Sequence, residues 1–149
     1  MDRFADADVL SLSGRLDIVY YMMLIYTQER GPDALSPAER LRVEESHRAL
    51  IDETRSRGIL VAVNPLARTD AAATVRRSDD KVLVTDGPFA ETKEQFAGYY
   101  ILDCRDRDEA VAWAARIPTQ CGGAHGSIEI RRVHEIPGVP ESRLSPGPH

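Results

Sequence analysis

An uninterrupted apolar run near the amino terminus, VYYMMLIY at Val19–Tyr26, constrains the fold of this chain more than any other segment. The run is too short to cross a membrane as a helix, which needs about 20 apolar residues. It shows no alternation of apolar and polar residues, which indicates a strand covered on both faces. We therefore predict that it forms the central strand of a packed sheet.

Two helices and five further strands are predicted after this run. SPAE at Ser36–Glu39 is a capping box, and the helix that it starts is expected to end near Arg57, before Gly58. DRDE at Asp106–Glu109 is read as a second capping box, starting a helix that Pro118 ends. The other strands are expected at Ile59–Val63, Ala73–Arg77, Lys81–Thr85, Phe96–Asp103 and Ser127–Val133. Gly98 is expected to allow a close approach of the backbone within its strand.

This order of elements, β α β (ββ) β α β, predicts an α+β fold. The expected architecture is a ferredoxin-like sandwich, in which two helices pack on a mainly antiparallel sheet and an extra β-hairpin is inserted. One face of such a sheet has no helices on it. Small proteins of this build often cover that face by pairing with a second copy, so we expect a homodimer.

The bulk composition limits the class of protein. A chain of 149 residues has room for one domain with a hydrophobic core. Its 19 basic and 24 acidic residues give a net charge of −5, which argues against direct binding of nucleic acid. Its two cysteines, Cys104 and Cys121, have no metal-ligand spacing, and we expect both to be reduced thiols in a cytoplasmic protein.

The two ends of the chain differ from its middle in composition. Residues 1–17 contain acidic residues and no apolar stretch of the kind found in signal peptides, and we interpret them as an extension before the domain. Residues 137–149 are rich in proline and are expected to form an irregular tail. The predicted domain is residues 18–136, and no membrane segment is expected in the chain.

The segment VTDGPFAETKE at Val84–Glu94 has two interpretations. In the first it is a structural corner, in which Gly87 and Pro88 turn the chain and Phe89 enters the core. In the second the same rigid corner directs the carboxylate of Asp86 into a cleft. There the carboxylate could orient an imidazole or accept a proton.

His47 is expected on the buried stripe of the first helix, with Val43, Leu50 and Thr54. A histidine in such a position is most often a core residue whose ring nitrogens are hydrogen-bonded. It is also suited to general acid/base catalysis, because its pKa lies near neutrality. In that case Asp86 is the carboxylate that we predict as its partner.

Three cations on or beside strands, Arg76, Lys93 and Arg131, are candidate ligands for a small anion. Alternatively they are solvated, or paired with Glu91 and Glu129. No residue spacing in the chain indicates a metal site or a phosphate-binding loop, and no cofactor is predicted.

Several of these segments resemble the DGPF subgroup of the YCII-related proteins. They are YYMMLIY, AATVRRSDDKVLVTDGPFAETKEQFAGYYILD, DEAVAWAARIP and GSIEIRRV, together spanning about residues 20–133. The resemblance implies a fold of the dimeric α/β-barrel type, with a cleft near the subunit interface. It further implies a His–Asp active site in that cleft, in which His47 matches the histidine and Asp86 is the carboxylate of the motif. The last strand departs from the family pattern at Arg132, where a proline is common.

The resemblance also has implications for function. Some YCII-like domains are linked to dechlorination-type chemistry, whereas DGPF proteins generally lack an established reaction. Members also occur beside extracytoplasmic-function sigma factors.

Three hypotheses about function follow from these observations. The first is a small-molecule enzyme, in which His47 and Asp86 perform acid/base chemistry and Arg76, Phe89, Lys93 and Arg131 contact a small anionic or aromatic ligand. The second is a non-catalytic ligand-binding or regulatory module associated with a sigma factor. The third is an interaction scaffold.

Overall fold

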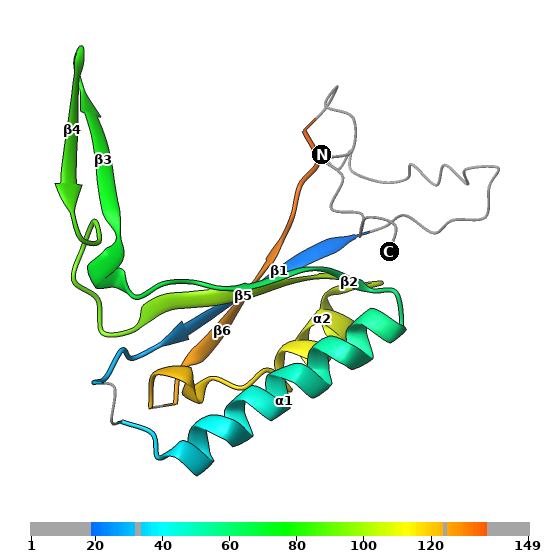
Figure 1. Ribbon diagram of the computed structural model, residues 1–149. Helices are drawn as coiled ribbons and strands as arrows, with labels where there is room; N and C mark the ends of the chain where they lie inside the picture. Colours follow the sequence, from blue (N-terminus) through cyan, green and yellow to red (C-terminus); the bar gives the residue numbers. More distant parts are fainter. Residues whose placement is uncertain (1–18, 32–33, 124, 137–149) are drawn as a thin grey trace.

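A computed structural model of the protein describes residues 19–31, 34–123 and 125–136 (Figure 1). Its element order matches the order predicted from the sequence. The extension and the tail, residues 1–17 and 137–149, lie outside the described residues. The elements are β1 (Tyr20–Thr27), α1 (Pro37–Ser56), β2 (Leu60–Pro65), η1 (Thr69–Ala71), β3 (Ala73–Ser78), β4 (Lys81–Asp86), β5 (Gln95–Asp103), α2 (Arg107–Ala114), η2 (Gln120–Gly122) and β6 (Ser127–Arg132), where η marks a 3₁₀ turn.

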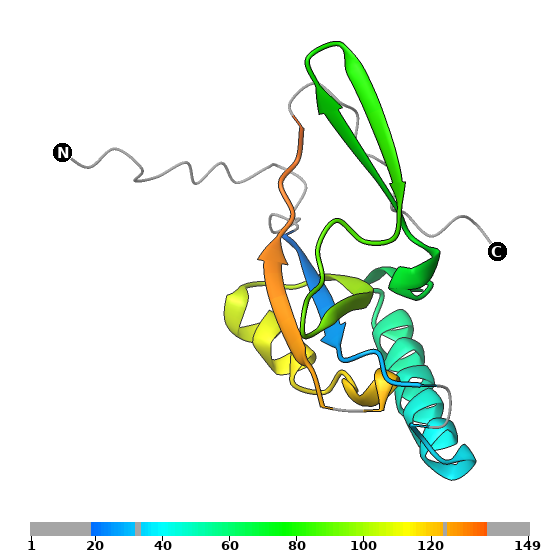
Figure 2. The same cartoon turned by 90° about the vertical axis from the view of Figure 1, so that its left-hand side faces the viewer.

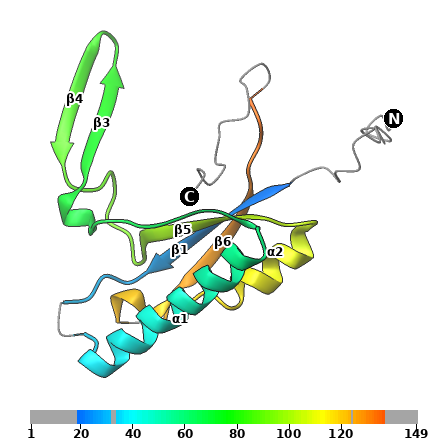
Figure 3. The same ribbon diagram turned by 45° about the vertical axis from the view of Figure 1, so that its right-hand side comes forward.

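The main sheet has four strands in the order β2-β5-β1-β6, and all neighbouring strands are antiparallel. As predicted, β1 is a central strand, because it pairs with β5 on one side and β6 on the other. The sheet is open and does not close into a barrel within the chain. Both helices lie against the same face of the sheet, which is clearest when Figures 1 and 3 are compared.

The core forms between this face of the sheet and the two helices. Alternate residues of a strand point to opposite faces, so Met23 and Ile25 of β1 and Tyr100 and Leu102 of β5 point toward the helices. The predicted stripe of α1 meets them: Leu50 and Thr54 are buried and His47 is half-buried. The α2 residues in this core are Ala110, Trp113 and Ala114.

The two helices differ in how the backbone amides at their amino-terminal ends are hydrogen-bonded. The capping box of α1 is confirmed: the Glu39 amide donates to Ser36 Oγ, and the Ser36 amide donates to Glu39 Oε2 at 2.7 Å. At α2, Asp106 accepts from the Glu109 amide, but the prediction of a full box is wrong. The Glu109 carboxylate accepts instead from the amide and guanidinium of Arg105. No helix in the described residues is long and apolar enough to cross a membrane.

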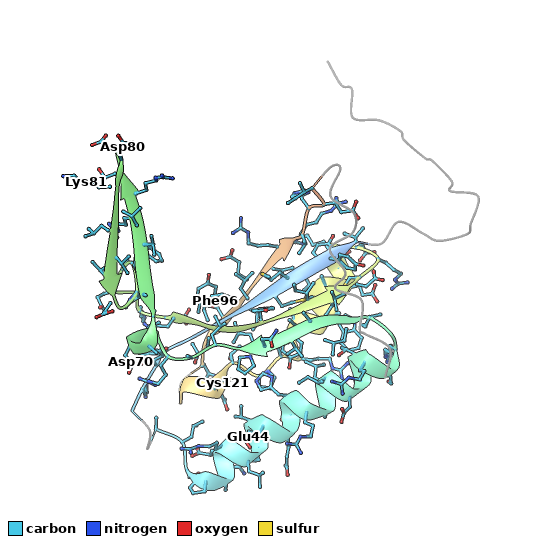
Figure 4. The ribbon with its side chains drawn as sticks, turned by 45° about the horizontal axis from the view of Figure 1, so that its top comes forward. Glu44, Asp70, Asp80, Lys81, Phe96 and Cys121 are labelled. Carbon is cyan, nitrogen blue, oxygen red and sulfur yellow. The ribbon has the colours of Figure 1, made fainter. Side chains whose placement is uncertain are left out.

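The inserted hairpin, β3 and β4, forms a separate two-stranded sheet that stands away from the main sheet (Figures 1 and 2). Asp80 and Lys81 lie at its tip and Asp70 near its base (Figure 4). Four apolar side chains along it are each 59–65% exposed, namely Val75, Val82, Leu83 and Val84. An isolated two-stranded hairpin is at best marginally stable in water, so this exposure indicates a surface that is suited to a partner.

The corner Asp86-Gly87-Pro88 closes the base of the hairpin. Gly87 has a φ of 91°, a conformation that favours glycine, and its amide donates to the Ala72 carbonyl. The Thr74 hydroxyl donates to the Gly87 carbonyl at 2.8 Å, and Arg76 donates to the Phe89 carbonyl at 3.0 Å. The prediction that Phe89 enters the core is wrong, because its side chain is 74% exposed. The hairpin stands off the helical layer, so no core lies beneath this corner.

Candidate functional site

A cavity of about 710 Å³ lies between α1 and the β2–β5 side of the sheet. One wall is the inward face of α1, from Arg40 to Ile51, and another is the end of β2 with residues 97–100 of β5. The remaining wall comes from the segment that follows β1 and from Cys121 of η2. A volume of this size suits a small organic molecule.

Gly98 is the reason that β2 and β5 approach closely beside the cavity. A Cβ atom added at Gly98 would lie 2.9 Å from the Asn64 carbonyl oxygen and 3.1 Å from Pro65 Cα. Both are backbone atoms, so a larger residue would separate the two strands. The close approach predicted for this glycine is confirmed, and it shapes the cavity wall.

His47 is held in the cavity wall by contacts to both ring nitrogens. Its Nδ1 lies 2.8 Å from the hydroxyl of Tyr100, which points from β5 toward the helices. Its Nε2 lies 3.2 Å from Sγ of Cys121. The imidazole and the Tyr100 ring are also nearly parallel, with an interplanar angle of 16°. These contacts fix the position of the imidazole between a hydroxyl and a thiol.

The protonation states in this cluster follow from burial. Loss of solvent lowers the pKa of His47 below its usual value, so the ring is neutral at pH 7 and can accept a proton. Burial raises the pKa of Tyr100 to about 12, which keeps its hydroxyl protonated. Burial also raises the pKa of the Cys121 thiol. The cluster is therefore uncharged at neutral pH, with one potential base and two potential proton donors.

Close backbone packing places Cys121 opposite α1. A Cβ atom at Gly123 would lie 2.5 Å from Cβ of Ala34, and one at Gly126 would lie 1.8 Å from the Tyr26 carbonyl oxygen. These glycines let the segment between α2 and β6 lie directly against its neighbours. Figure 4 shows Cys121 on this segment, on the side of the sheet where Glu44 of α1 lies.

The charged side chains around the cavity are mostly cationic. Among the described residues, its lining includes four arginines and one carboxylate: Arg30, Arg40, Arg48, Arg68 and Glu44. On α1, Arg40, Glu44 and Arg48 follow one another at intervals of four residues, so they share a face. Guanidinium groups bind carboxylate and phosphate through paired hydrogen bonds. The cavity is therefore suited to a small anion.

The segment after β1, which supplies Arg30, is fixed to the sheet and to η1. Its neighbour Glu29 accepts from the Thr69 amide at 2.9 Å and from the Thr69 hydroxyl at 2.7 Å. The Glu29 amide donates to the Gln95 side chain at 2.8 Å, and Arg68 donates to the Arg30 carbonyl. Arg30 and Arg68 are thus held on the same side of the cavity.

Of the residues that the sequence suggested for the site, only His47 lines this cavity. Asp86 lies at the end of β4 and is exposed, so a single chain does not bring it into the cavity with His47. The four predicted ligand contacts also lie outside it. Arg76 bonds the Phe89 carbonyl, Phe89 and Lys93 are exposed, and Arg131 lies 3.8 Å from Glu129. No group of three or more potential metal ligands occurs among the described residues.

The partners of His47 were missed by sequence reasoning. Tyr100 could have been found from the sequence, because Gly98, Tyr100 and Leu102 are alternate residues of one strand and so lie on the same face. A tyrosine on the face that meets the helices needs a hydrogen-bond partner for its hydroxyl. Arg40 also had a signal, since it lies seven residues before His47 and therefore on the same stripe of α1. Cys121 had none, because 74 residues separate it from His47.

Comparison with known proteins gives one family and one close relative. The model of the YCII-related domain matches residues 19–137, which is most of the chain. The chain belongs to the YCII-related domain family. An uncharacterised protein of Rhizobium meliloti (strain 1021) is 40% identical over 111 residues, covering 74% of this chain and 89% of that protein. In this YCII-related domain the match includes the sheet, both helices and every described residue that lines the cavity.

Proposed function

We propose that this YCII-related protein is a small-molecule enzyme that binds an anionic substrate in the cavity and transfers a proton through His47. The observation that carries the proposal is the position of the imidazole. It lines a cavity of about 710 Å³, is neutral at pH 7, and is fixed through Nδ1 by Tyr100. A positioned neutral imidazole is the commonest general base in enzymes.

Tyr100 takes the orienting role that the sequence suggested for Asp86. When Nδ1 carries the proton it donates to the Tyr100 hydroxyl oxygen, and the Nε2 lone pair then faces Cys121 and the cavity. When Nε2 carries the proton, the Tyr100 hydroxyl donates to Nδ1. Both tautomers keep the ring in the same place, so the imidazole can give or accept a proton without moving.

The arginines of the lining indicate which class of substrate the cavity binds. With four guanidinium groups and one carboxylate in the lining, the cavity favours a ligand with at least one negative charge. Arg48 and His47 both line the cavity, so a carboxylate or phosphate bound by Arg48 would share the cavity with the imidazole. The reacting carbon of a small substrate would then lie near the imidazole.

The test is a ligand screen followed by a proton-exchange assay. Thermal shift is measured with small carboxylates and phosphate monoesters, and ¹H NMR in D₂O then follows exchange of carbon-bound protons in the compounds that bind. Arg48→Gln is expected to weaken binding about tenfold, which corresponds to about 1.4 kcal/mol. His47→Gln is expected to retain binding and lose exchange.

Arg131→Gln is the matched control, because Arg131 has the same charge and lies outside the cavity. Its binding is expected to equal that of the wild type. If His47→Gln exchanges protons as fast as the wild type, the catalytic role is wrong. Binding of an anion without any exchange or conversion would instead favour the non-catalytic ligand-binding module.

We also propose that the protein is a homodimer of ferredoxin-like subunits within the DGPF subgroup. The strand order β2-β5-β1-β6 and the segment TDGPFAETKE support the fold and the subgroup. The exposed valines of the hairpin support the dimer, together with Met22, Leu24 and Tyr26, which alternate with the buried residues of β1 and face away from the helices. A second copy of the chain is the partner that we propose for these surfaces.

A further inference from the structure

The contact between His47 and Cys121 joins a nucleophile to a base inside the cavity. Nε2 of His47 lies 3.2 Å from Sγ of Cys121, and both residues belong to the cavity lining. A thiol beside a neutral imidazole is the arrangement by which cysteine nucleophiles are activated. Because the thiol itself stays protonated near neutral pH, it reacts faster where a neighbouring group removes its proton.

We propose that Cys121 is a nucleophile with His47 as its base, and that the cavity captures small carboxylates that carry an electrophilic carbon. The proposal shares the cavity and the base with the proposed function and adds a covalent step. The thiol proton moves to His47 Nε2, Sγ forms a bond to the electrophilic carbon, and the bond from that carbon to its leaving group breaks. The leaving group departs with the electron pair, so no oxidant or reductant is required.

The side chains that line the cavity with Cys121 indicate that the electrophile carries a negative charge. Arg40 and Arg48 line the cavity from α1, as His47 does, and Arg30 and Arg68 line it from the segments after β1 and β2. Glu44 is the acidic side chain of the lining, and Tyr100 is the titratable group that faces His47 from β5. The cations place the carboxylate of a ligand in the same cavity as the thiol.

The other cysteine is an internal control. Cys104 is 1% exposed, and burial raises the pKa of its thiol to about 12. It does not line the cavity. In the folded protein it is therefore expected to be unreactive, so any modification of the native chain reports on Cys121.

The experiment measures alkylation by iodoacetate and iodoacetamide, using intact-mass spectrometry and peptide mapping. In the folded wild type at pH 7, iodoacetate is expected to modify Cys121 alone, and at least about tenfold faster than in His47→Gln. The ratio of iodoacetate to iodoacetamide rates is expected to exceed the ratio for the same chain in urea, where the arginines no longer surround the thiol. Arg48→Gln is expected to lower that ratio, and Arg131→Gln to leave it unchanged.

The pH profile separates base catalysis from simple thiol ionisation. In the wild type the rate is expected to level off between about pH 7 and pH 8.5, where His47 is neutral and the thiol is still protonated. In His47→Gln the rate is expected to rise about tenfold per pH unit over the same range, as for an unassisted thiol. Circular dichroism checks the fold of each variant, and Tyr100→Phe provides a second disturbance of the base if His47→Gln does not fold.

Equal rates in the wild type and His47→Gln, or a rate no higher than in the urea-unfolded chain, would overturn the proposal. Alkylation is measured without any substrate. A negative result in this experiment can therefore be told apart from a negative result in the ligand screen and proton-exchange assay that test the proposed function. Cys121→Ser completes the separation. It is expected to abolish labelling, and residual labelling of the folded variant would also contradict the assignment.

Discussion

The hydroxyl of Tyr100 lies 2.8 Å from Nδ1 of His47, and this contact joins the middle of β5 to the middle of α1. The two residues are 53 positions apart in the sequence. The contact satisfies a hydroxyl on a side chain that is 1% exposed and orients the imidazole in the cavity. A single hydrogen bond thus serves both the core and the candidate site.

Replacing Tyr100 with phenylalanine is expected to lower the free energy of unfolding by about 1 kcal/mol, because the half-buried Nδ1 loses its partner. Urea unfolding followed by circular dichroism measures the change. Tyr99→Phe is the control, because its hydroxyl contacts Asn64 at 3.0 Å in an exposed position. If the two variants lose equal stability, the His47 contact has no special role in the fold.

The stability of the protein is expected to fall below pH 6.5 through His47. Burial lowers the pKa of this ring in the folded chain, so the unfolded chain binds the additional proton first as the pH falls. Stability is therefore fully present above the unfolded pKa and decreases as the pH approaches the folded pKa. The unfolding free energies of the wild type and His47→Gln are measured from pH 7.5 to 5. They are expected to differ at neutral pH, and the difference is expected to shrink as the pH falls. Parallel curves would contradict the buried, neutral ring.

Gly98→Ala is expected to reduce the free energy of unfolding by about 1–3 kcal/mol, because its Cβ would press on the backbone of β2. The nearest atoms are the Asn64 carbonyl oxygen at 2.9 Å and Pro65 Cα at 3.1 Å. Gly31→Ala is the matched control, since a Cβ there meets nothing within 4 Å. Denaturant unfolding compares the two variants. A Gly98→Ala protein as stable as the Gly31→Ala protein would show that the strands can separate freely.

The hairpin is expected to contribute to a homodimer through one of its two faces. Val75 and Val84 are directly opposite one another, and Thr74 and Thr85 form the neighbouring pair on the other face. Light scattering after size exclusion is expected to give twice the chain mass for the wild type and a lower mass for Val84→Lys. Thr85→Lys adds the same charge on the other face and is expected to stay dimeric. A wild-type protein that is monomeric in this experiment would contradict the proposed homodimer.

Local sequence was enough to predict most of the fold. The apolar run of β1, the capping box at Ser36 and the glycine at Gly98 each depend on near neighbours in the chain or on one repeating period. For this reason the order of elements and the inward face of α1, including His47, were predictable. The corner at Asp86-Gly87-Pro88 was also predictable as a turn, because glycine and proline restrict the backbone wherever they occur.

The environment of each side chain was decided only by the tertiary structure. Phe89 is exposed because the hairpin stands away from the helices, and no local pattern carries that information. His47 meets Tyr100 and Cys121 because β5 and η2 converge on α1 from 53 and 74 residues away. Local sequence patterns were sufficient to predict the order of the elements and the position of His47 on the inward face of α1. Packing of distant segments decided which of them meet, because short-range contacts between side chains depend on distance in space and not on distance along the chain.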